Sequence, residues 1–171
     1  NSRLDDYGRR RQAGHFGRHT QQRVLKLMSC NLALILGGAR SGKSAYAEQL
    51  AKDTGLKLTY IATSQVYDTE MQERVDLHQQ RRNADWKTVE EPIALLDCLK
   101  QEAKPDTVVL VDCLTLWLTN LILNDGLDDQ DQLDKFVENL SFKGSVILVS
   151  NEVGLGIVPE NKLARRFRDL A

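Results

Sequence analysis

Short, almost continuously apolar runs recur along the chain and are separated by longer stretches with helical spacing. The apolar runs are Leu32 to Leu36, Leu58 to Ala62, Val108 to Val111 and Val146 to Val149. Continuous apolar character is typical of strands that helices cover on both faces. Helical spacing occurs at about residues 43–53, 69–82, 92–102, 114–123 and 131–140. Strands that alternate with helices predict an α/β fold, with a mostly parallel sheet flanked by helices.

The first apolar run leads directly into a glycine-rich loop. Its sequence is GGARSGKS, made up of Gly37, Gly38, Ala39, Arg40, Ser41, Gly42, Lys43 and Ser44. In a phosphate-binding loop of this pattern, backbone N–H groups surround a β-phosphate, the lysine reaches the β- and γ-phosphates, and the serine hydroxyl binds Mg²⁺. A glycine turn without a ligand is the alternative, but a strand before the loop and a helical pattern after it favour phosphate binding. The sequence therefore predicts a nucleoside triphosphate site in which Lys43 is catalytic.

Polar residues also follow the other predicted strands, and ligands of parallel sheets bind at the carboxyl ends of the strands. Asp112 closes the third run, and its carboxylate is a candidate Mg²⁺ ligand opposite Ser44, with a helix cap as the alternative. The cluster Thr63 to Gln65 fits a ligand contact and an ordinary turn equally well. Asn151 and Glu152 open a loop, VGLGIVP, that either closes over a substrate or only links strand to helix.

The segment from Asp68 to Arg82 places a histidine among arginines. On a helix, Arg74, His78 and Arg82 lie at positions i, i+4 and i+8, on one face. Two neighbouring cations disfavour protonation of the imidazole and attract a triphosphate. A neutral imidazole is a nucleophile, and phosphorus is a suitable target for it. The alternative is a solvated surface histidine, the commoner situation on a polar helix, and the pattern alone does not decide between the two.

Charge separates the first 28 residues from the rest of the chain. The 171 residues have a net charge of −1, yet residues 1–28 carry seven Lys and Arg against two Asp and Glu. Their composition predicts a basic, disordered or non-native extension, with an arm for an anionic partner as the alternative. Residues 29–171 are left with an acidic balance and form one domain. That balance argues against a nucleic-acid partner.

The cysteines and the lack of long apolar runs indicate in which cellular compartment the protein is expected. Cys30, Cys98 and Cys113 are an odd number without CxxC spacing, which predicts reduced thiols rather than disulfides or a zinc site. No run has the length of a membrane span, and the first residues lack the apolar core of a signal peptide. The expected location is the cytoplasm, and the expected substrate is a small molecule.

A series of longer motifs resembles one enzyme family. After GGARSGKS the series comprises YIATSQ, EMQERVDLHQQRR, ADWKTVE, VVLVDCLTLWLTNLI and NEVGLGIVPENKLARRFRDLA. Together they resemble the bifunctional adenosylcobinamide kinases and adenosylcobinamide-phosphate guanylyltransferases of cobalamin biosynthesis. The resemblance implies a RecA-like fold of the P-loop NTPase class and a compact homo-oligomer, expected to be a trimer. Members of that family continue beyond the match with a further helix and a last strand.

The resemblance also implies two reactions on a corrinoid substrate. A nucleoside triphosphate, ATP or GTP, first phosphorylates the aminopropanol hydroxyl of adenosylcobinamide. GTP then donates GMP to that phosphate through a GMP-histidine intermediate, which yields adenosylcobinamide-GDP and pyrophosphate. By the same resemblance, the intermediate forms on His78, and the nucleotide contacts beyond the phosphate loop are Ala62, Thr63, Ser64, Gln79, Gln80, Arg81, Arg82, Glu90 and Asp112. A carboxylate such as Glu90 can accept hydrogen bonds from guanine N1–H and N2–H₂, which adenine does not supply in that pattern.

Two other functions remain as alternatives. A small-molecule kinase with a single activity would use the phosphate loop but not His78. A GTP-dependent binding switch would use the γ-phosphate to order a loop such as Val153 to Pro159, and a corrinoid would not affect its nucleotide turnover. Neither alternative requires a histidine flanked by arginines.

Overall fold

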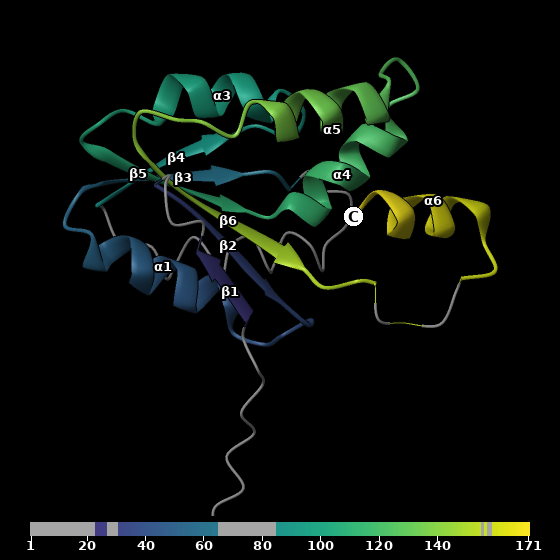
Figure 1. Ribbon diagram of the computed structural model, residues 1–171, viewed down its shortest axis with the longest axis horizontal. Helices are drawn as coiled ribbons and strands as arrows, with labels where there is room; N and C mark the ends of the chain where they lie inside the picture. Colours follow the sequence, from purple (N-terminus) through teal and green to yellow (C-terminus); the bar gives the residue numbers. More distant parts are fainter. Residues whose placement is uncertain (1–22, 27–30, 65–84, 155, 157–158) are drawn as a thin grey trace, which may run out of the picture.

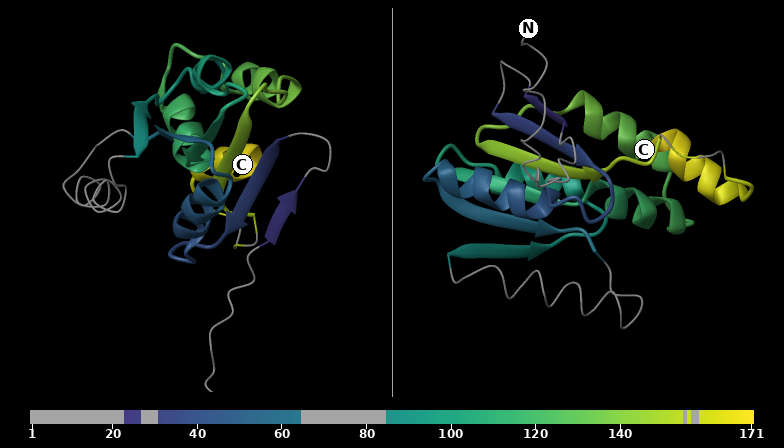
Figure 2. Two further views of the ribbon diagram at one scale, coloured as in Figure 1. Left: turned by 90° about the vertical axis from the view of Figure 1, so that its left-hand side faces the viewer. Right: turned by 90° about the horizontal axis from the view of Figure 1, so that it is seen from below.

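Six strands form a single sheet in the computed structural model, which describes residues 23–26, 31–64, 85–154, 156 and 159–171. The strands are β1 (Arg23–Lys26), β2 (Leu32–Gly37), β3 (Lys57–Ala62), β4 (Trp86–Glu90), β5 (Thr107–Asp112) and β6 (Ser145–Asn151). Their order across the sheet is β1-β2-β6-β5-β3-β4. All neighbours from β2 to β4 pair in parallel, and β1 pairs antiparallel with β2 at one edge (Figure 2). The predicted α/β fold with a mostly parallel sheet is confirmed.

Helices cover both faces of this sheet. They are α1 (Lys43–Asp53), α3 (Leu95–Glu102), α4 (Leu114–Leu123), α5 (Asp129–Glu138) and α6 (Lys162–Leu170). Figure 1 shows α1 on one face and α3, α4 and α5 on the other, while α6 lies beyond the carboxyl end of β6. The crossovers that the structure describes, through α1, through α3 and through α4 and α5, therefore return over a face of the sheet (Figure 1), as parallel pairing requires. No helix in these described ranges is long and apolar enough to cross a membrane.

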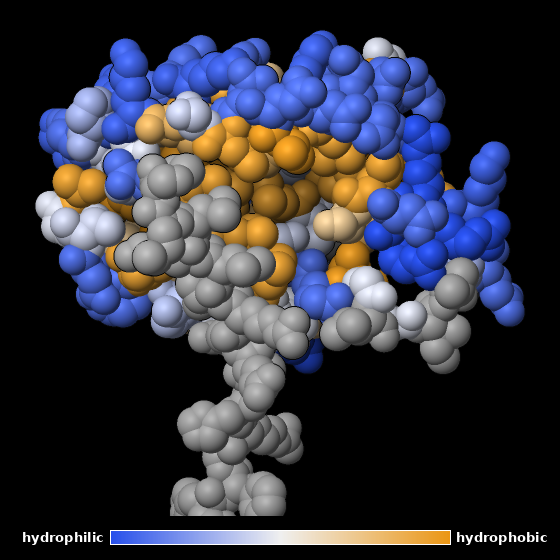
Figure 3. Space-filling view, viewed as in Figure 1, coloured by the Kyte–Doolittle hydropathy of each residue, from blue (hydrophilic) through white to orange (hydrophobic). Residues whose placement is uncertain are grey.

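Successive residues of the central strand β5 serve two separate cores. Val109 and Val111 pack with α3, α4 and α5, whereas Val108 and Leu110 pack with α1, and all four are fully buried. This two-sided burial is the reason that the strand sequences are continuously apolar. In the space-filling view of Figure 3, apolar side chains fill the middle of the molecule, between the polar outer surfaces of α3 and α5 and that of α1.

The periodicity predicted most of these elements and missed three. All four predicted strands are present, and the predicted helices 43–53 and 114–123 coincide with α1 and α4. The helix predicted over 92–102 begins only at Leu95, because the Glu91 carboxylate accepts hydrogen bonds from the N–H groups of Ile93 and Ala94 at 3.0 and 2.7 Å. The helix predicted over 131–140 lies two residues earlier, because Asp128 caps α5. The helix predicted over 69–82 lies outside the described residues.

The three elements that the periodicity missed are β1, β4 and α6. Strand β1 belongs to the predicted extension 1–28, so part of that segment extends the sheet, from the pair Arg23–Leu36 to the pair Lys26–Ala33. Strand β4 is an edge strand in which only Trp86 is buried. Helix α6 has no buried residue. The little buried surface of β4 and α6 leaves these two elements with a weak apolar pattern.

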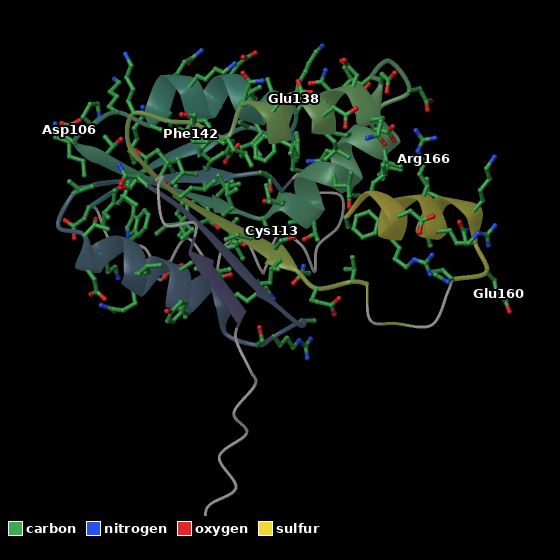
Figure 4. The ribbon with its side chains drawn as sticks, in the orientation of Figure 1. Asp106, Cys113, Glu138, Phe142, Glu160 and Arg166 are labelled. Atoms are coloured by element: carbon green, nitrogen blue, oxygen red, sulfur yellow. The ribbon has the colours of Figure 1, made fainter. Side chains whose placement is uncertain are left out.

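An ion pair fastens α6 to the rest of the fold. Asp129 at the start of α5 is 4% exposed, and Arg166 of α6 donates to both of its carboxylate oxygens, with Nε to Oδ2 at 2.9 Å. Figure 4 shows Arg166 reaching from α6 towards the layer of α4 and α5. The hydrogen bond from Arg166 lowers the pKa of Asp129, and burial of the carboxyl group opposes that shift.

This ion pair predicts a pH-dependent stability. Because the pKa of Asp129 is lower in the folded chain than in the unfolded chain, its contribution is complete above the unfolded value of about 4 and is lost as the pH falls through the folded value. Replacing Arg166 with Gln is therefore expected to lower the melting temperature at pH 7 by about 2 °C, and by progressively less below pH ~4. Replacing Arg168, which pairs with the exposed Asp169, is the control. Thermal melts from pH 3 to pH 7 test this, and a difference that does not change with pH would contradict it.

Candidate nucleotide-binding site

The carboxyl ends of five parallel strands meet along one edge of the sheet. Gly37 pairs with Asn151, Asp112 lies opposite Val149, and Ala62 lies between Asp112 and Glu90. The candidate residues from the phosphate loop, from the end of β3, from the end of β4 and from Asp112 therefore come to the same edge. This is the position at which ligands bind to parallel sheets.

The loop from Gly37 to Ser44 joins β2 to α1 and has the backbone of a phosphate-binding loop. Gly42 has φ 88°, and Arg40 adopts a left-handed conformation with φ 56°. A side chain at Gly37 would lie 2.9 Å from the Ser41 hydroxyl. Left-handed conformations turn successive N–H groups towards one point, and the N-terminus of α1 adds a partial positive charge there. The arrangement fits the phosphates of a nucleotide.

Lys43 lies under this loop rather than in solvent. It is 7% exposed, and its ammonium group donates to the carbonyl oxygen of Gly38 at 2.6 Å and contacts the Ser41 hydroxyl at 3.5 Å. Burial lowers the pKa of Lys43, while Cys113 and Asp112 act in the opposite direction. The ammonium group is thus held near the Asp112 carboxylate, with two acceptors supplied by the loop itself. A phosphate oxygen is a further acceptor that this position suits.

The residues predicted to bind Mg²⁺ have unused oxygen atoms. Tyr60 donates a hydrogen bond to Oδ2 of Asp112 at 3.2 Å, and no described residue donates to the other carboxylate oxygen. The Ser44 hydroxyl likewise has no partner in the described part of the chain. Mg²⁺ prefers such oxygen ligands and takes the rest from phosphates and water. Among the described residues no group of three or more His, Cys, Asp or Glu side chains could hold a metal ion.

The alternative role of Asp112, a helix cap, is not supported. The N-cap residue of α4 is Cys113, and no side chain makes a capping hydrogen bond there. Figure 4 shows Cys113 in the middle of the molecule, where β5 leads into α4. Burial raises the pKa of this thiol. Cys113 is therefore an uncharged core residue beside the site.

Thr63 has a structural contact that the sequence did not indicate. Its side chain is fully buried, its hydroxyl donates to the carbonyl oxygen of Cys113 at 2.8 Å, and the hydroxyl accepts from the Cys113 N–H at 2.9 Å. These bonds use the hydroxyl group and join the ends of β3 and β5. The predicted nucleotide contact of Thr63 is thus limited to its backbone, while Ala62 and Ser64 on either side are half-buried.

Two asparagines connect α4 to this edge of the sheet, and of these only Asn120 was not indicated by the sequence analysis. Asn120 of α4 is 4% exposed, and its amide donates to the carbonyl oxygens of Thr63 and Pro92 at 2.7 and 3.0 Å. Asn151 donates to the Thr115 hydroxyl at 3.0 Å. The segments after β3, β4 and β6 are thereby tied to α4. A single amide within the apolar sequence LTLWLTNLIL is the signal that could have identified Asn120.

Glu90 is the exposed last residue of β4. No described residue donates to its carboxylate, whereas the neighbouring Glu91 is occupied at the start of α3. Glu90 is therefore available to a ligand at the edge. The loop predicted over Val153 to Pro159 is described only in part, and its Gly154 N–H donates to the carboxylate of the preceding Glu152 at 2.8 Å.

The predicted nucleophile lies outside the described residues, together with its predicted neighbours Gln79, Gln80, Arg81 and Arg82. His78 belongs to the segment 65–84, which joins β3 to β4. That segment leaves β3 at Ser64, at the same edge as the phosphate loop. The roles assigned to these five residues stay predictions.

A comparison with models of protein families shows to which family the chain belongs. The model for cobinamide kinase / cobinamide phosphate guanyltransferase matches residues 33–171. The chain belongs to this family. It is 53% identical over 143 residues to the bifunctional adenosylcobalamin biosynthesis protein CobP of Pseudomonas aeruginosa, a match that covers 81% of each chain. It is 41% identical over 155 residues to the bifunctional adenosylcobalamin biosynthesis protein CobU of Escherichia coli, covering 82% of this chain and 85% of the relative.

Proposed function

We propose that this chain is a bifunctional transferase of cobalamin biosynthesis, with residues 29–171 as its catalytic domain. It phosphorylates adenosylcobinamide with ATP or GTP and then transfers GMP from GTP to the product. The observation that supports this most is the placement of Lys43, Ser44 and Asp112 at one sheet edge, in a member of the cobinamide kinase / guanyltransferase family.

In the kinase step, the loop residues hold the β- and γ-phosphates through backbone N–H groups and through the ammonium group of Lys43. The substrate hydroxyl loses its proton and attacks the γ-phosphorus, the bond to the β–γ bridging oxygen breaks, and the nucleoside diphosphate leaves. Ser44 and Asp112 would hold Mg²⁺, which neutralises charge on the phosphates. The buried position of Lys43 strengthens its attraction to the charge that develops on the leaving oxygen.

In the transfer step, a neutral His78 ring nitrogen attacks the α-phosphorus of GTP, and pyrophosphate leaves. A phosphate oxygen of adenosylcobinamide phosphate then attacks the same phosphorus, and the phosphorus–nitrogen bond breaks. In this proposal the neighbours of His78 in the sequence also bind the nucleotide, namely Gln79, Gln80, Arg81 and Arg82. Glu90, exposed at the end of β4, would accept hydrogen bonds from guanine and so distinguish GTP from ATP.

The same proposal includes the partner, the oligomeric state and the compartment of the enzyme. A corrinoid is the small-molecule partner, and an acidic body makes nucleic acid an unsuitable one. The proposed assembly is a homo-oligomer, expected to be a trimer, and the proposed compartment is the cytoplasm.

Product analysis tests the proposal against its alternatives. The protein is incubated with adenosylcobinamide, Mg²⁺ and either ATP alone or ATP with GTP, and the corrinoids are identified by mass spectrometry. The proposal predicts adenosylcobinamide phosphate with ATP alone and adenosylcobinamide-GDP when GTP is added. A phosphate product without the GDP product would indicate the single-function kinase, and GTP hydrolysis unaffected by the corrinoid would indicate the switch.

A further inference from the structure

The Tyr60 hydroxyl group makes a contact that the proposed reactions do not themselves require. Tyr60 lies on β3, two residues before its end, and donates a hydrogen bond to Oδ2 of Asp112 at 3.2 Å. Its side chain is 4% exposed, and its ring packs edge-on against Trp86 with 6.2 Å between the ring centroids. The packed ring has little freedom to move, so the hydroxyl group is fixed relative to the sheet.

This contact divides the Asp112 carboxylate into two unlike oxygens. Oδ2 accepts from Tyr60, whereas the other oxygen receives no hydrogen bond from the residues that the structure describes. Asp112 is the last residue of β5, so only its side-chain torsions are free to vary. A fixed phenol on one oxygen restricts those torsions and directs the other oxygen away from the tyrosine.

We propose that Tyr60 is a positioning residue, which orients Asp112 so that one carboxylate oxygen is presented to the Mg²⁺ accompanying the nucleotide. The inference rests on the proposed function, since it takes Asp112 as a ligand of that ion. Tyr60 itself is buried in the core cluster that includes residues of β3, β4 and α1, so its proposed effect on the ion is exerted through Asp112.

Replacing Tyr60 with Phe tests the inference, because phenylalanine keeps the packed ring and removes only the donor. Mn²⁺ binding is followed by electron paramagnetic resonance with a non-hydrolysable GTP analogue present. The affinity for Mn²⁺ is expected to fall about tenfold, the usual loss for a hydrogen bond to a charged group, while the melting temperature without metal falls by no more than about 4 °C. The Mg²⁺ concentration for half-maximal kinase activity should rise in parallel. The control is Tyr46→Phe, whose ring is 40% exposed on α1 and whose replacement should change none of these values.

A double-mutant cycle with Asp112→Asn tests the positioning role of Tyr60 separately from the role of Asp112 as a metal ligand. If Tyr60 acts through Asp112, the double variant binds Mn²⁺ no more weakly than Asp112→Asn alone. Additive losses, or an unchanged Mn²⁺ affinity in Tyr60→Phe, would overturn the inference about Tyr60 and leave the role of Asp112 intact. An unchanged affinity in Asp112→Asn would overturn both the inference and the proposed metal ligand, whereas the product analysis above tests the reactions independently.

Discussion

Replacing Lys43 with Met is expected to lower the kcat/KM of the kinase step on the order of 10³-fold. Methionine fills a similar volume without charge, so the loss reports the missing attraction to the phosphates. The effect should be large because Lys43 is 7% exposed, and water cannot replace its ammonium group at the loop. Initial rates of adenosylcobinamide phosphate formation over a range of ATP concentrations measure it.

The same substitution should not destabilise the fold. Burial lowers the pKa of Lys43, which means that the fold is unfavourable to the charged form. Without nucleotide, the melting temperature of Lys43→Met is therefore expected to equal or exceed that of the wild type. Lys52→Met, an exposed position in the last turn of the same helix, is the matched control and should retain full activity. A near-normal kcat/KM in Lys43→Met would contradict the proposed role of the phosphate loop in the kinase step.

Replacing His78 with Ala is expected to separate the two reactions. The transfer of GMP to adenosylcobinamide phosphate should fall on the order of 10⁴-fold, because the covalent route needs the imidazole nucleophile. The kinase step uses the phosphate loop and should continue. The two reactions are measured separately, the first with ATP and adenosylcobinamide, the second with GTP and adenosylcobinamide phosphate.

Two outcomes would contradict the proposal that His78 takes part in the GMP transfer and not in the kinase step. Equal losses in both reactions would mean that His78 supports the fold or a shared pocket rather than the transfer alone. Unchanged transfer would mean that another group attacks the α-phosphorus. His15→Ala, in the predicted extension, is the matched control and should change neither reaction.

Helices and strands were predicted from the sequence where their own apolar pattern identifies them, and were missed where they depend on contacts with distant residues. Helix α4 was predicted with its correct ends, because its sequence is almost continuously apolar and five of its ten residues are buried. Strand β4 was missed, because three of its five residues are exposed and its pairing with β3 depends on distant residues. Helix α6 was missed for a related reason, since no residue of it is buried and Arg166 holds it to α5.

The candidate nucleotide site likewise contains residues that the sequence identifies and residues that it does not. The phosphate loop is a contiguous motif, and Asp112 follows from the rule that ligands bind where parallel strands end. Tyr60 and Asn120 could not be assigned in this way, because their partners Asp112 and Thr63 lie 52 and 57 residues away in the sequence. Thr63 shows the limit of the rule: a polar side chain at a strand end can bond to the neighbouring strand instead of a ligand, and the sequence does not distinguish the two.

The proposed transfer of GMP depends on a covalent intermediate at His78, and this adduct can be detected. Wild-type protein and His78→Ala are incubated with Mg²⁺ and GTP labelled at the α-phosphate, without a corrinoid, and the denatured protein is analysed for bound label. We expect an acid-labile, alkali-stable label that peptide mapping places on His78, that is absent from His78→Ala, and that does not form from GTP labelled at the γ-phosphate. No label on the wild type, or label that persists in His78→Ala, would contradict it.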